Sequence, residues 1–336
     1  MKSAQVTKYD KNSTSLSMVE INKPHVASGQ VLVKVLTAGV NPVDNMISRG
    51  EVKLIVPYKL PFIAGNEVVG VIEEIDSSVK GFNIGDRVFS RLPLNSIGAF
   101  AEYVAVDAQA IAKVPEYLSD EEAAGVPLTA LTSMQALELM GIKPGETIFI
   151  SGGTGSVGAM AIPIAKAQGL TVITSGSVDS KDRVLELGVD KFIDYKTEDY
   201  TKVLSNIDHV LDTLGGDETE KQMSIMKKGG HLVSLRAMPN GSFAKRMRLP
   251  IWKQILFTIA GRKFDKLAEK YGIHYHFIFV QSNGDQLNEV ANILSKLELK
   301  PSIDSVYPFE EVNSALDKVA NGHSRGKTVL SIQKTL

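Results

Sequence analysis

The 336-residue sequence predicts an α/β protein with a strand-rich, antiparallel, barrel-like unit and a second unit built on a doubly wound parallel sheet. Three observations support this fold class. Residues 1–118 contain several short alternating strand segments separated by turn residues. From Thr147 onward, short apolar segments alternate with helical ones, as in parallel sheets. A glycine-rich loop follows the first of these apolar segments.

Four strands are predicted in the first unit. They cover residues 30–40 (QVLVKVLTAGV), 67–75 (EVVGVIEEI), a segment after the Asp-Arg turn of 81–90 (GFNIGDRVFS), and 99–107 (AFAEYVAVD). A helical pattern then begins at Ser119, a residue suited to cap the acidic first turn of residues 120–122. We expect this helix to run to Met140.

The second unit begins with a strand at residues 147–150 and continues with alternating strands and helices. Further strands are expected at 171–177, 191–195, 209–216, 231–235 and, last in the sheet, 276–280, followed by a helix at 284–297 and a final strand in the tail.

Composition excludes several classes of protein. The chain contains 37 Lys and Arg residues and 38 Asp and Glu residues. Its net charge is therefore near zero, which argues against an overall electrostatic attraction to nucleic acids or membranes. Cysteine is absent, which excludes disulfides and thiolate-ligated zinc. The first residues lack the apolar core of a signal peptide, and the longest apolar stretch is shorter than a membrane span. We therefore expect a cytoplasmic protein.

Residues 239–272 stand apart, with eight Lys or Arg and two acidic residues. Ile251, Ile255 and Ile259 fall four apart, which predicts an amphipathic helix. We favour a helix packed on its own domain with its basic face in solvent. Binding of a membrane, a partner or RNA through this segment is the alternative.

The glycine-rich loop follows strand 147–150 and precedes an apolar helix, the setting of a dinucleotide-binding loop. Gly153 permits the tight turn, Gly155 lets the backbone approach a pyrophosphate, and Gly158 allows close packing of helix and strand. The loop residues expected to bind the cofactor are Gly153, Thr154, Gly155, Ser156, Val157 and Gly158. A purely structural glycine turn is the alternative.

The end of the next strand favours NADPH over NADH. An acidic residue at this point would bind the ribose hydroxyls of NADH, but residues 174–177 read Thr-Ser-Gly-Ser. Lys181 and Arg183 follow and suit a 2′-phosphate, and ordinary surface charge on a helix is the less favoured alternative. Asp179 is the residue that opposes this interpretation.

These features together resemble the medium-chain dehydrogenase/reductase superfamily, in particular its zinc-free quinone oxidoreductase-like branch. The motifs that carry the resemblance span the chain and include AGVNPVD, FIAGNEVVGVIEEI, GAFAEYVAV, SGGTGSVG, LDTLGG, KKGGHLVSL and GHSRGKTVL. The resemblance implies a GroES-like catalytic domain formed by residues 1–122 and 281–336. It also implies a Rossmann domain formed by 123–280, and a homodimer.

The positions of the zinc ligands in related enzymes carry other residues here. Asn41 stands where a cysteine would be, Asn66 replaces the histidine before Glu67, and no ligand stands near Leu128. Because catalytic zinc needs three protein ligands, we predict no metal site. None of the histidines forms an HxxxH pair, and we expect all of them to be structural or exposed. Glu67 is expected to be a structural carboxylate paired with an arginine such as Arg87 or Arg325.

The resemblance also implies individual roles. Asn41 and Thr132 would lie at the nicotinamide, with Asp44 as a further catalytic candidate whose simpler role is to cap a helix. The resemblance implies contacts to the adenosine half of the cofactor from Ser175, Gly176, Ser177, Lys181 and Tyr195. It implies contacts to the nicotinamide carboxamide from Phe277, Ile278, Phe279 and Val280. Lys327 is implied to lie near the cofactor.

Met46 occupies the position of a tyrosine that many relatives carry, and in enoyl reductases that tyrosine is a candidate proton donor. A quinone suits a site without a dedicated acid, since water can protonate the phenolate-type product. We therefore expect NADPH-dependent reduction of a small quinone-type acceptor. Reduction of α,β-unsaturated carbonyls and an NADPH-binding protein without turnover are the alternatives.

Overall fold

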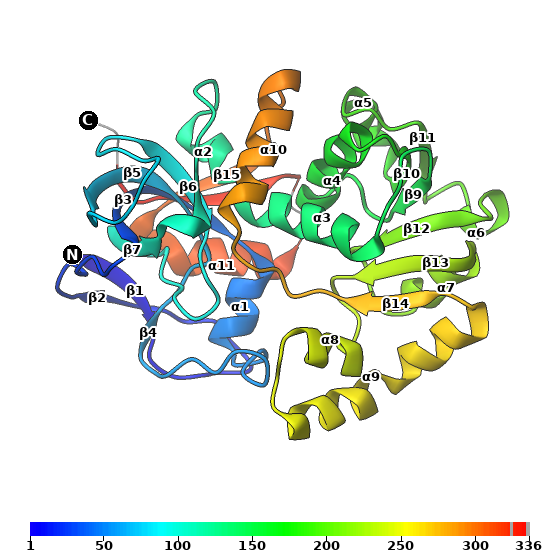
Figure 1. Cartoon of the computed structure of the whole chain (residues 1–336), viewed down its shortest axis with the longest axis horizontal. Helices are drawn as coiled ribbons and strands as arrows, with labels where there is room; N and C mark the ends of the chain where they lie inside the picture. The colour runs from blue at the N-terminus through cyan, green and yellow to red at the C-terminus, as the bar shows by residue number, and fades with distance from the viewer. Residues whose placement is uncertain (323–324, 334–336) are drawn as a thin grey trace. The chain divides into compact units, whose positions relative to one another are not determined.

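The computed structural model describes residues 1–322 and 325–333 (Figure 1). The chain divides into two compact units, Met1–Leu131 with Gln281–Leu336, and Thr132–Val280. The division falls inside helix α3 (Pro127–Met140), whereas the sequence indicated a boundary after residue 122. We refer to these parts as unit 1 and unit 2.

Unit 1 is built on a seven-stranded sheet centred on β3 (Gln30–Val40) and β5 (Glu67–Ile75), which pair antiparallel. The sheet runs in the order β15 (Ile303–Pro308), β16 (Lys327–Ser331), β3, β5, β6 (Arg87–Arg91) and β8 (Ile111–Lys113), with β7 (Tyr103–Asp107) also pairing with β3. A smaller sheet contains β2 (Ser17–Glu20), β1 (Lys2–Val6) and β4 (Phe62–Ile63). Only β15 and β16 in this unit are paired parallel among the described residues.

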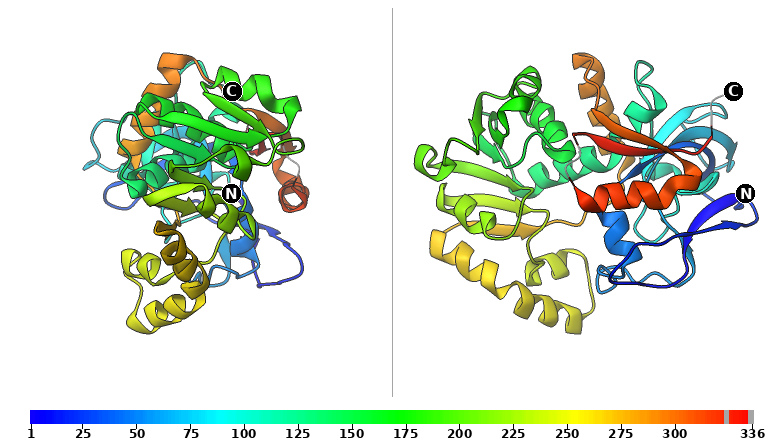
Figure 2. Two further views of the ribbon diagram at one scale, coloured as in Figure 1. Left: turned by 90° about the vertical axis from the view of Figure 1, so that its right-hand side faces the viewer. Right: turned by 180° about the vertical axis from the view of Figure 1, so that it is seen from behind.

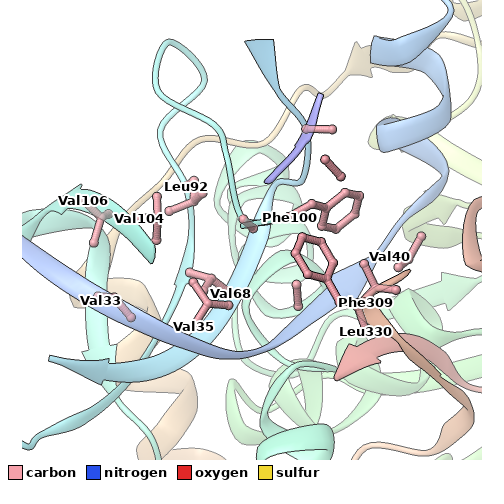
Figure 3. Packing of buried hydrophobic residues seen from close by; sticks show 14 of the residues in the cluster. Val33, Val35, Val40, Val68, Leu92, Phe100, Val104, Val106, Phe309 and Leu330 are labelled. Carbon is pink, nitrogen blue, oxygen red and sulfur yellow. The ribbon is translucent and has the colours of Figure 1, made fainter. Parts of the chain in front are cut away.

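The core of unit 1 gathers apolar side chains from both ends of the chain. Val33 and Val35 of β3 belong to one cluster with Phe309 and Leu330, which come from the last 30 residues (Figure 3). The tail therefore completes the core of the N-terminal barrel. Four helices belong largely to this unit: α1 (Pro42–Ser48), α2 (Asp120–Ala123), α10 (Gly284–Leu297) and α11 (Val312–Asn321).

The helix predicted from Ser119 is two helices. Ser119 caps α2 through a reciprocal pair of bonds: its Oγ accepts from the Glu122 N–H at 3.1 Å, and Glu122 Oε2 accepts from the Ser119 N–H at 2.8 Å. The helix stops at Ala123, and α3 begins anew at Pro127. Proline suits a first helical turn, because its missing N–H would have no helical partner there.

Unit 2 is a doubly wound parallel sheet, as the sequence predicts. Its order is β11 (Lys191–Asp194), β10 (Thr171–Gly176), β9 (Thr147–Ile150), β12 (Ile207–Asp212), β13 (Met226–Ser234) and β14 (His274–Phe277). Counted from β9 this is the order 3-2-1-4-5-6 of dinucleotide-binding sheets, which reverses between β9 and β12. The helices are α4 (Ser156–Ala167), α5 (Lys181–Glu186), α6 (Tyr200–Val203), α7 (Glu218–Ser224), α8 (Gly241–Arg246) and α9 (Ile251–Tyr271).

One prediction for unit 2 was wrong in detail. The last strand covers 274–277 rather than 276–280, so Ile278 to Val280 follow it. The segment 239–272 forms helices α8 and α9 beside β14 (Figures 1 and 2), and Ile251, Ile255 and Ile259 are exposed. Helix α9 packs inward through Phe257, Gly261 and Ala268. Among the described residues, no helix is long and apolar enough to cross a membrane.

Candidate functional site

The glycine-rich loop connects β9 to α4 at the point where the strand order of unit 2 reverses. A Cβ on Gly153 would lie 1.9 Å from Thr174 Oγ1, and one on Gly158 would lie 2.4 Å from the Gly153 Cα. Both distances are far below van der Waals contact. These two glycines are therefore required by the packing of the loop between β10 and α4.

Gly155 is different, because nothing in the described protein crowds it. A Cβ there would meet only the Gly152 carbonyl oxygen, at 3.4 Å. Gly155 is also the N-cap of α4 and provides no side-chain acceptor for the first turn, which contains Ser156 and Val157. A helix start with uncapped N–H groups and open space at its glycine fits the phosphates of a dinucleotide.

Residues from three elements meet beside this loop. A Cβ on Gly176, at the end of β10, would lie 2.3 Å from the Thr154 methyl group. Arg183 Nη2 donates to the Thr154 carbonyl at 2.5 Å, and the Tyr195 N–H donates to the Gly176 carbonyl at 3.3 Å. The structure thus brings together Thr154, Gly176, Arg183 and Tyr195, as expected for one adenosine-binding region.

Ser175, Ser177 and Lys181 lie along the same stretch. Ser175 is buried near the end of β10, whereas just after the strand Ser177 is half-buried and Lys181 is exposed. Asp179 is exposed in the short turn between them.

The remaining cofactor candidates of unit 2 lie at the end of β14, just after it, and on α3. Phe277 ends β14, and its carbonyl accepts from Arg246 Nη2 at 2.5 Å, a contact that sequence reasoning missed. Ile278 donates its N–H to the Ser234 carbonyl at 3.3 Å, and Phe279 and Val280 follow. Thr132 is buried on α3 in unit 2, whereas Asn41 and Asp44 belong to unit 1.

A buried polar cluster occupies unit 1, formed by Asn41, Asp44, Asn66, Glu67 and Lys327. At its centre, Glu67 is fully buried, and its Oε1 accepts from the Leu128 N–H at 2.7 Å. Its Oε2 accepts from Asn41 Nδ2 at 2.9 Å and from the Lys327 ammonium. Lys327 also donates to Asn41 Oδ1 at 2.7 Å. Buried charges need such partners, because an unpaired carboxylate would be strongly destabilising.

This geometry corrects the expected partner of Glu67. Arg87 instead pairs with Asp120, Nε to Oδ1 at 3.0 Å. The Arg325 N–H donates to Asp304. The cation that Glu67 pairs with is Lys327, from a strand on the far side of β3.

Gly39 explains how the two charged side chains fit against β3. A Cβ on Gly39 would lie 2.3 Å from Glu67 Oε2 and 2.7 Å from Lys327 Cε. Only glycine leaves room for the ion pair at this point of the strand.

Asp44 is both a helix-capping residue and a buried acid. Its Oδ2 accepts from the Asn41 N–H at 2.7 Å, which closes the start of α1, and its Oδ1 accepts from Asn66 Nδ2 at 2.7 Å. Burial raises the pKa of Asp44 to about 6, against the opposing effect of these two hydrogen bonds. The side-chain amide of Asn66 therefore fixes the position of the Asp44 carboxyl group. The Oδ1 atom of Asn66 has no hydrogen-bond partner among the described residues.

Sequence reasoning missed two further residues near this cluster, Arg91 and Tyr58. Arg91 is fully buried, and burial lowers its pKa to about 10, while the nearby Asp44 and Glu67 act in the opposite direction. Burial likewise raises the pKa of Tyr58 to about 12, and its buried hydroxyl has no partner within the described part of the chain. For Arg91, the available signal was an arginine at the end of a buried strand, in the sequence RVFSR.

Four of the histidines gather on one part of the parallel sheet of unit 2. His209, His231 and His274 are register partners on β12, β13 and β14. His231 Nδ1 lies 3.1 Å from His276 Nε2, and His209 Nε2 lies 2.8 Å from Glu146 Oε2. Within residues 1–322 and 325–333, no group of three or more metal-ligand residues is arranged to hold an ion. His323 lies outside the described residues.

Comparisons with known proteins agree with both units. Residues 27–116 match the alcohol dehydrogenase GroES-like domain, and residues 187–330 match the family described as zinc-binding dehydrogenase. The chain is 31% identical to the mitochondrial NAD(P)H oxidoreductase RTN4IP1 of Danio rerio, over 91% of this chain and 84% of that protein.

It is also 31% identical to a 2-methylene-furan-3-one reductase of Solanum lycopersicum, over 91% of this chain and 73% of that protein. Among solved structures, the quinone oxidoreductase of Coxiella burnetii superposes with a TM-score of 0.82 at 28% identity, covering 99% of both chains. The protein is thus an oxidoreductase of the NAD(P)H-dependent type, and it belongs to the medium-chain dehydrogenase/reductase superfamily, in its quinone oxidoreductase-like branch.

Proposed function

We propose that this protein transfers hydride from NADPH to a small quinone-type acceptor without using zinc. The observation that carries the proposal is the Lys327–Glu67 ion pair next to Asn41, the residue that stands where the resemblance implies a zinc-ligating cysteine. Relatives named as quinone oxidoreductases, from Coxiella burnetii and Spinacia oleracea, support the choice of acceptor.

The residues at the zinc position fit an internal cation better than a metal. Both oxygens of Glu67 already accept N–H donors, and the amide of Asn41 is engaged by Glu67 and Lys327. A metal at this point would have to displace the ammonium of Lys327. Zinc sites are built mainly from nitrogen and sulfur ligands, and the ligand types in this cluster are the carboxylates of Glu67 and Asp44, both already engaged by N–H donors.

The ammonium of Lys327 has three N–H donors. Among the described residues, Glu67 and Asn41 accept two of them. The third donor, with its positive charge, is suited to stabilise an oxygen that gains negative charge during reduction. A quinone needs no stronger acid, because water can protonate the phenolate-type product.

NADPH is favoured over NADH by the region beside the glycine-rich loop. The end of β10, which includes Ser175, has no acidic residue, and Ser177 and Lys181 follow the strand. When bound, NADPH supplies the hydride at its nicotinamide ring. The chain's contribution is to hold the phosphates at the start of α4 and the 2′-phosphate near Lys181.

Reduction of α,β-unsaturated carbonyls is the second candidate. The tomato reductase and the NADPH-dependent alkenal/one oxidoreductase of Arabidopsis thaliana, 28% identical, favour it.

The test is a panel of quinones and enones assayed with NADPH or NADH, with and without a chelator. We expect quinone reduction that needs NADPH and resists the chelator. Lys181→Ala should raise the Kd of NADPH about tenfold and leave that of NADH unchanged, consistent with loss of one charged phosphate contact. Chelator-sensitive activity would contradict the zinc-free site, and turnover of enones alone would favour the second candidate.

A further inference from the structure

Helix α9 exposes a continuous set of large apolar side chains in its first half. The exposed fractions are 75% for Ile251, 59% for Trp252, 58% for Ile255, 40% for Leu256 and 68% for Ile259. We call these five residues the apolar ridge. Isolated exposed apolar residues are ordinary, but five neighbours on one helix form a contiguous patch, which typically marks an interaction surface.

The ridge lies on the side of α9 that faces away from its own unit. At 100° per residue, Ile255, Ile259 and Trp252 share one face, about 180° from Phe257, Gly261 and Ala268. Those three buried residues already anchor the helix: Phe257 contacts the Phe243 ring edge-on at 6.0 Å. The ridge is therefore not needed to hold α9 in place.

Basic residues flank the ridge at both ends. Lys245 and Arg248 precede it, and Arg262, Lys263 and Lys266 continue its outer face toward the C-terminal end of the helix. All five are exposed, and none forms a salt bridge within the described part of the chain. The two acidic residues of the helix are Asp265, which accepts a hydrogen bond from Asn240 at 2.6 Å, and Glu269, which is exposed.

We propose that α9 docks this face onto an anionic membrane surface, lying flat with the apolar ridge among the acyl chains and the basic residues at the headgroups. An exposed apolar face with Trp and a surround of Lys and Arg is the pattern of interfacial helices. The ridge covers nine residues, about 13 Å of helix, which is the length of a shallow interfacial contact rather than a span.

Charge and shape favour a membrane over other occupants. A second copy of this chain would bring the same basic residues face to face, and like charges oppose such a contact. The ridge stands out along one side of a helix, so a protein partner would need a matching groove, whereas a lipid surface adapts to it. Anionic headgroups complement the excess of positive charge.

Trp252 provides a direct probe, because it is the only tryptophan in the chain and lies in the ridge. We would titrate the purified full chain with vesicles of phosphatidylcholine alone or with phosphatidylglycerol, recording tryptophan emission and flotation with the vesicles. The expected result is a shift of the emission to shorter wavelength and flotation, both with the anionic vesicles. Raising the salt concentration should weaken the binding, because surface charges are then screened.

The decisive variant is Ile255→Glu with Ile259→Glu, which changes only exposed positions and leaves Trp252 in place. Vesicle binding should weaken at least about tenfold, since two apolar side chains no longer partition and two negative charges face the lipid. Ile84→Glu is the matched control: Ile84 is 69% exposed but lies in unit 1, and its replacement should leave binding unchanged.

Three outcomes would overturn the proposal. One is an unchanged emission spectrum with every vesicle composition. Another is binding that the double variant retains in full. The third is concentration-dependent self-association, measured by sedimentation velocity, that the double variant abolishes while vesicles have no effect; the ridge would then be a contact between copies.

Discussion

The buried ion pair of unit 1 allows a quantitative test by the substitution Lys327→Met. Glu67 is fully buried and the Lys327 side chain is 4% exposed, so removing the ammonium leaves a carboxylate that keeps only its two neutral N–H donors. Breaking such a pair from one side costs about 3–5 kcal/mol. For a unit of roughly this size each kcal/mol lowers Tm by about 2–4 °C, so the expected fall is on the order of 10 °C.

Thermal unfolding should be followed by calorimetry for wild type, Lys327→Met, Glu67→Gln and the double variant. Because the double variant removes both charges, it should be more stable than Lys327→Met alone, with a coupling of about 2–3 kcal/mol between the two sites. Lys2→Met breaks the exposed pair with Glu310 and should leave Tm unchanged. The inferred role of the Lys327–Glu67 pair is refuted if Lys327→Met has the same Tm as the Lys2→Met control. It is also refuted if the double variant has the lowest Tm of the series.

Three further predictions concern other parts of the site. Burial raises the pKa of Asp44 from 3.8 to about 6 in the folded chain. The stability that the protonated Asp44 contributes is therefore complete below pH 3.8, and about 3 kcal/mol of it is lost as the pH rises to 6. Urea unfolding of the wild type and of Asp44→Asn between pH 4 and 7 measures this loss. Gly155→Ala should fold normally but bind NADPH weakly, whereas Gly153→Ala should also lower Tm, as fluorescence titration and calorimetry will show. Burial lowers the pKa of His276 from 6.5 to about 4, so wild type should lose stability as pH falls through this interval, and His276→Asn should show a flatter profile in urea unfolding.

Much of the fold could be predicted because the strong patterns are local. The bounds of β3, β5, β9 and α10 match the sequence-based ranges. The three strands are clear apolar segments and α10 is a clear amphipathic pattern, and turn or capping residues close each of them. The β14 strand was predicted too late, at 276–280 instead of 274–277, because the apolar-rich run HFIFV continues past the point where pairing with β13 ends. Pairing partners, which decide the end of a strand, are not visible in its own residues.

In the candidate site, too, local patterns could be predicted from the sequence and long-range partners could not. The positions in the glycine-rich loop could be found from sequence, because a tight turn and close packing require glycine at defined spacing. The partner of Glu67 could not, since Lys327 is 260 residues away and reaches it only through the pairing of β16 with β3. On α9, the isoleucine spacing revealed an apolar face, but Phe257 and Ala268 form a second one, and only the structure shows which of them packs inward.

The central claim is hydride transfer from NADPH to a quinone-type acceptor by a site whose cation is Lys327. The most direct measurement is stopped-flow mixing of NADPH-loaded protein with a series of quinones, followed at the absorbance of the reduced nicotinamide. The account predicts rapid oxidation by at least one quinone, unchanged by a chelator and slowed in Lys327→Met, assayed below its own Tm. Oxidation by no quinone, together with rapid oxidation by an enone, would contradict it.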